Sequence, residues 1–189
     1  GAKLFIDSLQ QPVQAEPYLK QALHADPTDS EASRTLRGLY LERGAVSECV
    51  ELYEKELRSS DASPEVSDGW VEVGTLCVER LKDHGRALNA LEEAIAADGL
   101  NPEPYRIRGV IHEERGRPRL VFDALLHELR VGGLDEARLV RLRELTQEMV
   151  KKPRLHALAS QGAQKLAEIR DDDPVALTVQ HELELCRKD

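Results

Sequence analysis

A short pattern recurs four times along this chain of 189 residues, at an almost constant spacing. In each copy, a second residue follows the first after four positions and a third follows after three more. The copies are Ala15-x3-Leu19-x2-Ala22, Cys49-x3-Tyr53-x2-Glu56, Ala87-x3-Leu91-x2-Ala94 and Val121-x3-Leu125-x2-Glu128, and their first residues lie 34, 38 and 34 positions apart. A segment of this length cannot bury its own apolar face, so such segments stack on their neighbours. The sequence therefore predicts an all-α fold, an α-α superhelix of antiparallel helix pairs.

The composition supports helices rather than strands. Aromatic residues make up only 4% of the chain, with one Trp and one Met, so the core must consist mainly of Leu, Val, Ile and Ala. A β-sandwich would favour more aromatic and β-branched residues. Charged residues make up 32%, which is typical of many short helices that each have one face in water.

Prolines and glycines mark the expected helix ends. Three polar residues precede a proline, as an N-cap precedes a proline in the first turn of a helix: Ser63-Pro64, Asn101-Pro102 and Asp173-Pro174. Three glycines fall between helical runs, where the chain must reverse: Gly44, Gly85 and Gly116. We expect helices at about residues 2–10, 14–25, 30–43, 46–59, 64–82, 85–97, 102–115, 118–131, 135–151, 153–170 and 174–187.

The best-defined units also carry large and small residues at set places. One unit has Leu36-Arg37-Gly38-Leu39-Tyr40-Leu41-Glu42-Arg43-Gly44, then Cys49, Tyr53 and Leu57, and the next has Trp70, Val73, Gly74 and Cys77, then Ala87, Leu91 and Ala94. This arrangement resembles the tetratricopeptide repeat (TPR) family, which pairs two antiparallel helices in about 34 residues. Trp70, Gly74, Ala87 and Ala94 match the tryptophan, glycine and two alanines of the family. Small residues at these places let two helix backbones approach closely.

The resemblance covers about residues 2–131 and continues loosely over 134–189. We therefore expect about four TPR repeats in residues 1–133, followed by degenerate TPR-like helices and a candidate C-terminal cap in residues 134–189, as one continuous solenoid. Both ends of the chain fall inside expected helices, which favours a fragment of a longer protein.

Several features depart from a regular array. Arg37 stands where the family has a small residue, although Gly38 beside it can compensate, and Pro17 should delay or bend the helix that contains it. Extra residues in 58–66 and 98–102 lengthen two links, and the 38-residue interval marks an irregular link. The Arg-rich helix at 135–151 should be longer than its neighbours or tilted.

No catalytic or nucleotide-binding motif is present. The sequence lacks G-x-x-x-x-G-K-[ST], G-x-S-x-G and H-E-x-x-H, so we expect no catalytic residues, no metal site and no cofactor. His112 occupies the helix position of Tyr40 and Cys77 and is best interpreted as a packing residue. The run Asp171-Asp172-Asp173 fits the N-terminus of a helix, where the dipole favours carboxylates. The chain is thus expected not to be an enzyme.

Charge and cysteine content limit the partners and the compartment. A formal charge of −9 disfavours non-specific binding to nucleic acid and attraction to anionic membranes, and no run is long enough to span a bilayer. The three cysteines, Cys49, Cys77 and Cys186, have no CxxC spacing and are interpreted as reduced thiols in the cytoplasm. The Ala, Leu, Arg and Glu content suggests a bacterial origin.

The resemblance implies a binding surface on the first helix of each repeat, which lines the concave face in this family. Carried onto this chain, the partner-binding residues are Arg34, Leu41, Glu42, Val71, Thr75, Val78, Glu79, Arg106, Val110, Glu113 and Glu114. Glu42, Glu79 and Glu114 form an acidic row near helix C-termini, where the helix dipole opposes negative charge. Glu31, Asp68 and Glu103 also face inward, but they sit in first turns, where the same dipole explains them.

We expect this acidic and apolar surface to bind a basic or amphipathic peptide or helix of a partner protein, without catalysis. Some TPR proteins bind a C-terminal carboxylate through Lys and Asn, but here Gly38, Thr75 and Val110 replace Asn, which disfavours that mode. The alternative is a structural spacer or oligomerisation arm of a larger multidomain protein, with residues 134–189 making the contacts. A helical enzyme or regulator with an unrecognised small-molecule site is a third class.

Overall fold

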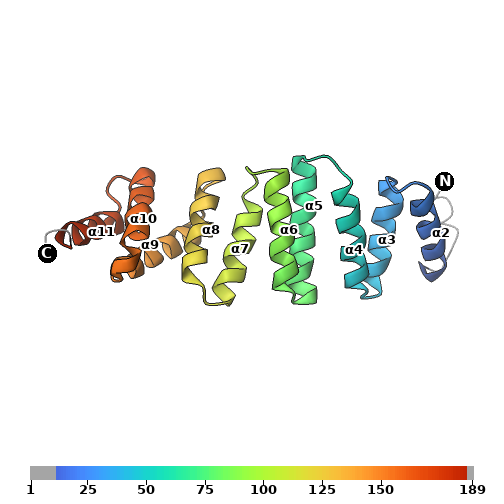
Figure 1. The fold of residues 1–189 in the computed structure, drawn as a ribbon, viewed down its shortest axis with the longest axis horizontal. Helices are drawn as coiled ribbons and strands as arrows, with labels where there is room; N and C mark the ends of the chain where they lie inside the picture. Colours follow the sequence, from blue (N-terminus) through green and yellow to red (C-terminus); the bar gives the residue numbers. More distant parts are fainter. Residues whose placement is uncertain (1–11, 187–189) are drawn as a thin grey trace. The chain divides into compact units, whose positions relative to one another are not determined.

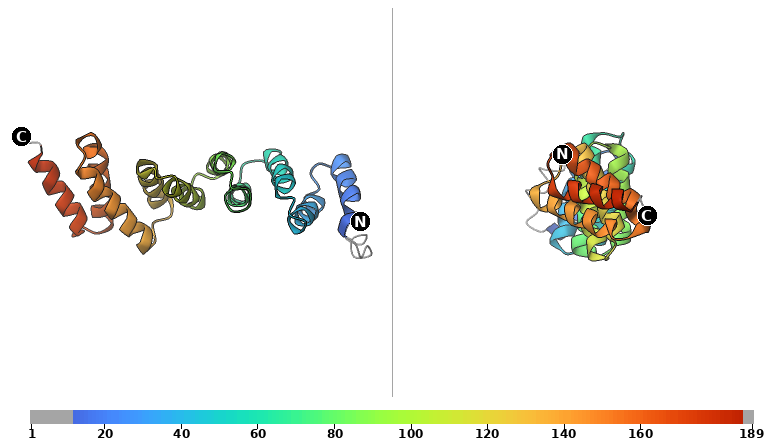
Figure 2. Two further views of the ribbon diagram at one scale, coloured as in Figure 1. Left: turned by 90° about the horizontal axis from the view of Figure 1, so that it is seen from below. Right: turned by 90° about the vertical axis from the view of Figure 1, so that its left-hand side faces the viewer.

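The computed structural model describes residues 12–186, and this part of the chain is built from helices without a single strand (Figures 1 and 2). The helices are α2 (Pro12–Ala25), α3 (Ser30–Glu42), α4 (Val46–Arg58), α5 (Pro64–Leu76), η1 (Cys77–Leu81), α6 (His84–Ala97), α7 (Glu103–Glu114), α8 (Pro118–Val131), α9 (Glu136–Val150), η2 (Pro153–Leu155), α10 (His156–Ile169) and α11 (Pro174–Leu185). The predicted all-α fold is confirmed. The predicted helix at 2–10 lies outside the described residues.

The helix ends follow local chemistry. Ser63 caps α5, since its hydroxyl oxygen accepts a hydrogen bond from the Val66 N–H at 3.2 Å, and Pro64 follows in the first turn. Gly85, expected at the chain reversal that precedes the helix predicted at 85–97, lies in the first turn of α6. Asp83 is the cap there, and its carboxylate accepts from the Arg86 N–H at 2.9 Å.

The described chain forms two compact units, which divide between Pro104 and Tyr105. The first unit contains α2 to α6, and the second contains nearly all of α7 and then α8 to α11. The predicted boundary between residues 133 and 134, which separates regular from degenerate repeats, stays a prediction.

In the first unit, each helix packs against the next one along the chain. Trp70, Val73 and Cys77 of the α5–η1 segment are buried, as are Ala87 and Leu91 of α6. A Cβ atom added at Gly74 would lie 3.0 Å from the Leu91 Cδ2 atom, so this glycine makes room for the α5–α6 contact. The predicted role of Gly74 as a small residue that lets two helices approach closely is confirmed.

In the second unit, α9, α10 and α11 pack against one another and α8 packs on α9. The fully buried side chains include Phe122, Leu142 and Leu166. A Cβ atom at Gly162 would overlap the Thr146 hydroxyl and would lie 3.0 Å from the Phe122 ring. The α9 helix has 15 residues against 14 in each of α8 and α10, so it is slightly longer than its neighbours, as predicted.

The 38-residue interval arises within a helix and not within a link. The link at residues 59–63 is as long as the link at 98–102. In contrast, α5 has 13 residues and η1 adds 5 in a π-helical turn, whereas α7 has only 12. A π turn absorbs an extra residue without breaking the helix. Lys82 then takes the left-handed conformation (φ 55°) that Gly44 and Gly116 adopt elsewhere.

The two irregular residues near the N-terminus are accommodated locally. Pro17 lies inside α2, which starts at Pro12 and is therefore not delayed. The Arg37 guanidinium lies over the Tyr53 ring, 3.4 Å from its centroid, and its Nε is 3.5 Å from a Glu56 carboxylate oxygen. Gly38 does not provide the compensating space, because a Cβ atom there would meet nothing within 4 Å.

Candidate functional site

The eleven predicted partner-binding residues are divided between the two units. Arg34, Leu41 and Glu42 lie on α3, Val71 and Thr75 on α5, and Val78 and Glu79 in η1, all within the first unit. Arg106, Val110, Glu113 and Glu114 lie on α7 in the second unit. The row of Glu42, Glu79 and Glu114 would span both units, and it stays a prediction.

One face of the α5–η1 segment combines apolar and acidic residues. Val71, Thr75 and Val78 recur at helical spacing and are half-buried. The Thr75 hydroxyl is satisfied within the helix, since it donates to the Val71 carbonyl oxygen at 2.9 Å. Asp68 and Glu79 flank this strip and are exposed. The face therefore offers an apolar strip bordered by carboxylates.

The carboxylates on the predicted binding surface differ in whether a protein group engages them. Glu42 and Glu79 form no ion pair with any side chain in the described range 12–186, and both are exposed. Glu113 is bound by Arg141 of α9, with Nη2 at 2.6 Å and Nε at 3.3 Å from its two oxygens. Asp68 accepts a hydrogen bond from the Asn101 side chain at 3.0 Å, which supports its structural interpretation. Glu42 and Glu79 remain the carboxylates that are best placed to meet a partner.

The acidic charge of the chain is concentrated in the first unit. Residues 1–104 contain 20 Asp and Glu against 10 Lys and Arg, whereas residues 105–189 contain 15 against 16. The formal charge of −9 is therefore distributed unevenly, and the negative excess belongs to the first unit. The first unit carries a negative electrostatic field, whereas the second is close to neutral.

A cavity of about 230 Å³ in the first unit lies away from the predicted surface. Its lining includes Leu57, Val66, Trp70 and Glu93 together with Arg58, whose guanidinium lies 5.6 Å from the Trp70 ring. None of the eleven predicted residues lines this cavity.

The turn after α7 has a buried histidine at its base. His112 is only 5% exposed, which confirms its predicted packing role, and its Nδ1 has no hydrogen-bond partner among the described residues. Burial lowers the pKa of His112, and the positive charges of Arg108, Arg117 and Arg115 lower it further. Sequence reasoning found the histidine but missed the arginines around it, although Arg115-Gly116-Arg117-Pro118-Arg119 is visible as a basic run.

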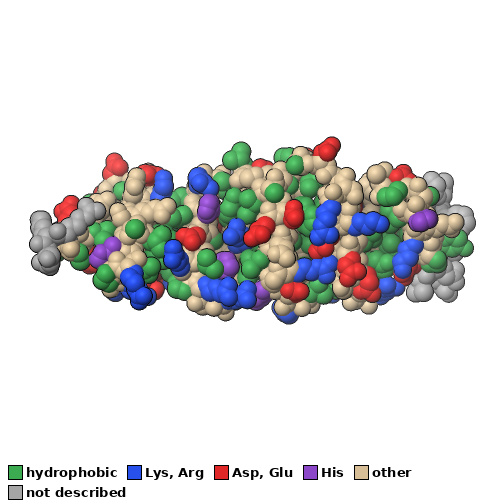
Figure 3. Space-filling model, viewed as in Figure 1, with side chains coloured by type: hydrophobic (Ala, Val, Ile, Leu, Met, Phe, Trp, Pro, Cys, Tyr) green, Lys and Arg blue, Asp and Glu red, His purple; other side chains and the backbone are tan. Residues whose placement is uncertain are grey.

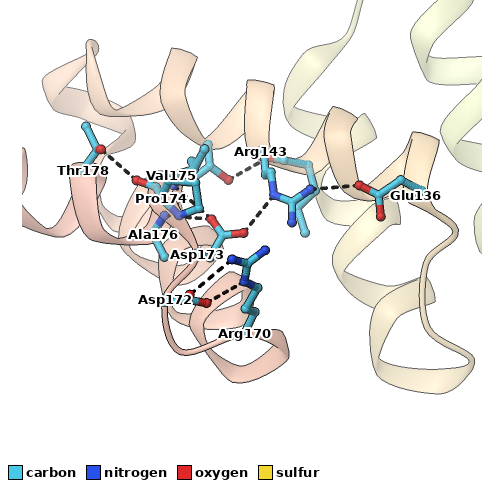
Figure 4. A network of polar contacts seen from close by, with 11 residues as sticks. Glu136, Arg143, Arg170, Asp172, Asp173, Pro174, Val175, Ala176 and Thr178 are labelled. Carbon is cyan, nitrogen blue, oxygen red and sulfur yellow. Dashed lines mark hydrogen bonds and ion pairs between the residues drawn. The ribbon is translucent and has the colours of Figure 1, made fainter.

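The acidic run at residues 171–173 has a structural role, as predicted. Asp173 caps α11, accepting from the N–H groups of Val175 and Ala176 at 3.0 and 3.1 Å (Figure 4). Its other carboxylate oxygen accepts from Arg143 Nε at 2.9 Å, and Asp172 accepts from Arg170. Two of these three carboxylates are thus engaged by protein groups. Within the described range, no three His, Cys, Asp or Glu side chains form a metal-binding group.

Sequence reasoning also missed a buried ion pair. Glu128 is 4% exposed, and its Oε2 accepts from Arg138 Nε at 2.7 Å. Burial raises the pKa of Glu128 although Arg138 opposes the shift. The sequence contained a signal for this pair, because Glu128 and Glu56 occupy the third position of the repeated pattern, where the other two copies have alanine. Glu56 likewise lies beside an arginine, Arg37, and accepts from the Ser33 hydroxyl at 2.6 Å.

Comparisons with known proteins agree on the fold. Residues 8–67 match the tetratricopeptide repeat family model, which confirms the resemblance predicted from the sequence. The solved structure of MamA aligns with a TM-score of 0.51 at 17% identity, covering 89% of this chain and 88% of that one. YrrB, described as a TPR protein with an unusual peptide-binding site, aligns with a TM-score of 0.52 at 18% identity, covering 95% and 88%.

Among curated proteins, none matches this sequence. At these identities the solved structures establish the fold alone, and the fold is that of a TPR protein. No helix in residues 12–186 has the length and apolar character needed to cross a membrane.

Proposed function

We propose that this TPR chain is a non-catalytic scaffold that binds a basic or amphipathic peptide or helix of a partner protein. The observation that carries the proposal is the face of α5 and η1, where the half-buried Val71 and Val78 lie beside the exposed Glu79. An amphipathic helix presents apolar anchors at the same i, i+3, i+4 and i+7 spacing, with its basic residues beside them.

The charge of the first unit supports a basic partner. Because Glu42 and Glu79 form no ion pair within the described residues, a lysine or arginine of a partner would not have to displace an internal one. The acidic surplus of the whole unit adds long-range attraction, which raises association rates mainly at low ionic strength. The apolar strip would then supply the part of the affinity that resists salt.

A peptide-binding TPR relative gives a precedent. YrrB is described as having a peptide-binding site, and its repeats align with most of this chain. We extend that role to this chain as a proposal, together with the predicted residues Arg34, Leu41 and Thr75 and, in the second unit, Arg106, Val110, Glu113 and Glu114.

We also propose that the protein acts in the cytoplasm of a bacterium. Cys49 and Cys77 are free and buried, and burial raises the pKa of Cys77 to about 11, so that the thiol stays neutral and unreactive. Buried free thiols suit a reducing compartment. The bacterial assignment is based on composition alone.

The test uses peptide binding by the full chain. A fluorescent amphipathic peptide with lysines beside a leucine stripe is titrated against wild type, Glu42→Lys/Glu79→Lys and a control, Glu51→Lys/Glu92→Lys. The control carries the same charge change at exposed positions on α4 and α6. We expect the first pair to weaken binding about tenfold or more and the control about twofold. Equal losses would show general charge attraction and contradict the proposed surface.

The alternative, a spacer or oligomerisation arm, has one observation in its favour. Large apolar side chains are exposed on the helices of residues 134–189: Val140 at 43%, Ile169 at 45%, Leu177 at 53% and Leu185 at 49%. Exposed apolar residues on a folded unit can mark a contact surface. Light scattering on wild type and on Leu177→Gln/Leu185→Gln tests the hypothesis of an oligomerisation arm. A dimer that the variant disrupts, together with no peptide binding, would favour it.

A further inference from the structure

The turn between α7 and α8 presents three arginines that form no ion pair within the described second unit. Arg115, Arg117 and Arg119 are exposed within five residues, and none comes within ion-pair distance of a carboxylate in the described part of the second unit. The nearest acidic residues in the sequence are already engaged. Glu113 is bound by Arg141, and Glu114 is also engaged in a polar or electrostatic interaction.

Four other arginines of the same unit behave differently. Arg138, Arg141, Arg143 and Arg170 each hold a carboxylate of Glu128, Glu113, Asp173 and Asp172, respectively. Arginine matches carboxylates well, because its guanidinium presents several N–H donors in a fixed plane. The arginines of the α7–α8 turn therefore have the right chemistry for carboxylates but form no ion pair with any residue in the range 12–186.

A second basic turn lies on the same edge of this unit. Lys151, Lys152 and Arg154, between α9 and α10, are exposed and likewise have no carboxylate within ion-pair distance in the described structure. Both turns lie at the lower edge of the second unit in Figure 1, and Figure 3 shows Lys and Arg side chains gathered there. We call these six residues the basic edge.

The α7–α8 turn is held in one conformation. The Gly116 N–H donates to the Glu113 carbonyl at 2.9 Å and the Arg117 N–H donates to the His112 carbonyl at 2.9 Å, which is a Schellman closure. Gly116 has a φ of 60°, and Pro118 fixes the start of α8. A turn that is already ordered loses little conformational entropy on binding.

We propose that the basic edge of the second unit binds an acidic, Asp- and Glu-rich peptide segment of a partner protein. This site lies in a different unit from the acidic face of α5 and η1 and has the opposite charge, so it does not depend on the function proposed above. Leu120, which is 37% exposed beside Arg119, offers contact to one apolar side chain of such a segment.

The surroundings favour a peptide over other anions. Proteins that bind single-stranded nucleic acid stack its bases on exposed aromatic rings, whereas Tyr105 and Phe122, the aromatic residues of the second unit, are both buried. An anionic membrane is bound most firmly by basic residues combined with several apolar ones, and Leu120 alone does not supply them. Carboxylates are the groups that arginines of this unit already bind.

The test is a titration of the full chain with a fluorescent twelve-residue peptide of Asp and Glu containing one leucine. The variant Arg115→Gln/Arg117→Gln/Arg119→Gln is compared with Lys55→Gln/Arg80→Gln/Lys82→Gln, which removes three exposed cations from the first unit. We expect the first variant to weaken binding about tenfold and the control less than about twofold. The variant Lys151→Gln/Lys152→Gln/Arg154→Gln should produce an intermediate loss.

Circular dichroism verifies that each variant keeps its helices. Equal losses in the first variant and the control would overturn the proposal. So would tighter binding of a single-stranded oligonucleotide, or of phosphatidylserine vesicles, through the same arginines. Self-association that disappears in the arginine variant, measured by light scattering without peptide, would identify a second copy as the occupant and also overturn it.

Discussion

The turns after α3 and after α7 have the same backbone but different electrostatics. Ala45 N–H donates to the Tyr40 carbonyl and Gly44 N–H to the Leu41 carbonyl, as Arg117 and Gly116 do after α7. After α3, the Arg43 guanidinium lies 4.7 Å from the Tyr40 ring and pairs with Glu16. After α7, His112 replaces the tyrosine and the equivalent Arg115 has no ion pair among the described residues. The repeat thus fixes the backbone of the turn, and the side chains at equivalent positions determine which charges it leaves exposed.

The two units also differ in how their cores are filled. The first unit packs Leu91 of α6 against Gly74, while the second places Phe122 against Gly162. Both arrangements use a glycine to admit a large side chain from a neighbouring helix, with Leu91 and Phe122 each 3.0 Å from an added Cβ atom, but at Gly162 the Thr146 hydroxyl lies nearer still. The following variants test how far the comparison between the units holds.

The largest expected effects come from the two core side chains. Phe122→Ala should lower the free energy of unfolding by about 3–5 kcal/mol and Leu91→Ala by about 2–5 kcal/mol, because both side chains are completely buried. Urea denaturation followed by circular dichroism measures the free energy of unfolding of the whole chain. Fluorescence of Trp70, the only tryptophan, follows the first unit. We expect Leu91→Ala to shift the fluorescence transition more than Phe122→Ala does, and equal shifts would contradict a division into two units.

Arg138→Met should cost about 3 kcal/mol at pH 7, since it leaves the buried Glu128 carboxylate without its counter-charge. Burial already raises the pKa of Glu128, and loss of Arg138 should raise it further. A raised folded pKa means that the folded state binds the proton more tightly, so stability falls as pH rises through that pKa. The cost of the variant should therefore shrink as the pH is lowered toward 5.

The matched control for this prediction is Arg141→Met. It breaks a pair whose carboxylate, on Glu113, is 48% exposed, so it should cost no more than about 1 kcal/mol. Denaturation curves at pH 5 and pH 7 distinguish the two variants. A cost for Arg138→Met that stays constant over this range would show that Glu128 keeps its charge without Arg138.

Two glycine variants should have opposite signs. Gly74→Ala introduces a methyl group 3.0 Å from Leu91 Cδ2 and should destabilise the chain by about 1–2 kcal/mol, because α5 and α6 must move apart. Gly38→Ala meets no atom within 4 Å and should stabilise α3 by up to about 1 kcal/mol. Thermal denaturation measures the change in stability of each variant. A stabilising Gly74→Ala would mean that the α5–α6 contact is looser than described.

The sequence predicted the helices well because their signals are local. Ser63 and Pro64 mark the start of α5, and Gly44 and Gly116 mark the two turns. The π turn of η1 was missed, since Lys82 takes a left-handed conformation that its residue type does not indicate.

The candidate site was less accessible to sequence reasoning. The exposed positions of Glu42 and Glu79 follow from helical spacing. The pairing of Glu113 with Arg141 joins residues 28 positions apart, so it depends on how α7 and α9 pack, which spacing does not determine. The uneven charge of the two units could have been read directly from the sequence, but only once their boundary was known.

The smallest expected difference tests the two turns directly. Arg43→Ala should cost about 0.5–1 kcal/mol, because it removes the contact with the Tyr40 ring and the partly exposed pair with Glu16. Arg115→Ala at the equivalent position should change stability by less than about 0.5 kcal/mol, since it removes no ion pair of the described chain. Urea denaturation of both variants gives the comparison. If Arg115→Ala cost as much as Arg43→Ala, the arginines after α7 would have a role in folding, and their availability to a partner would lose its main support.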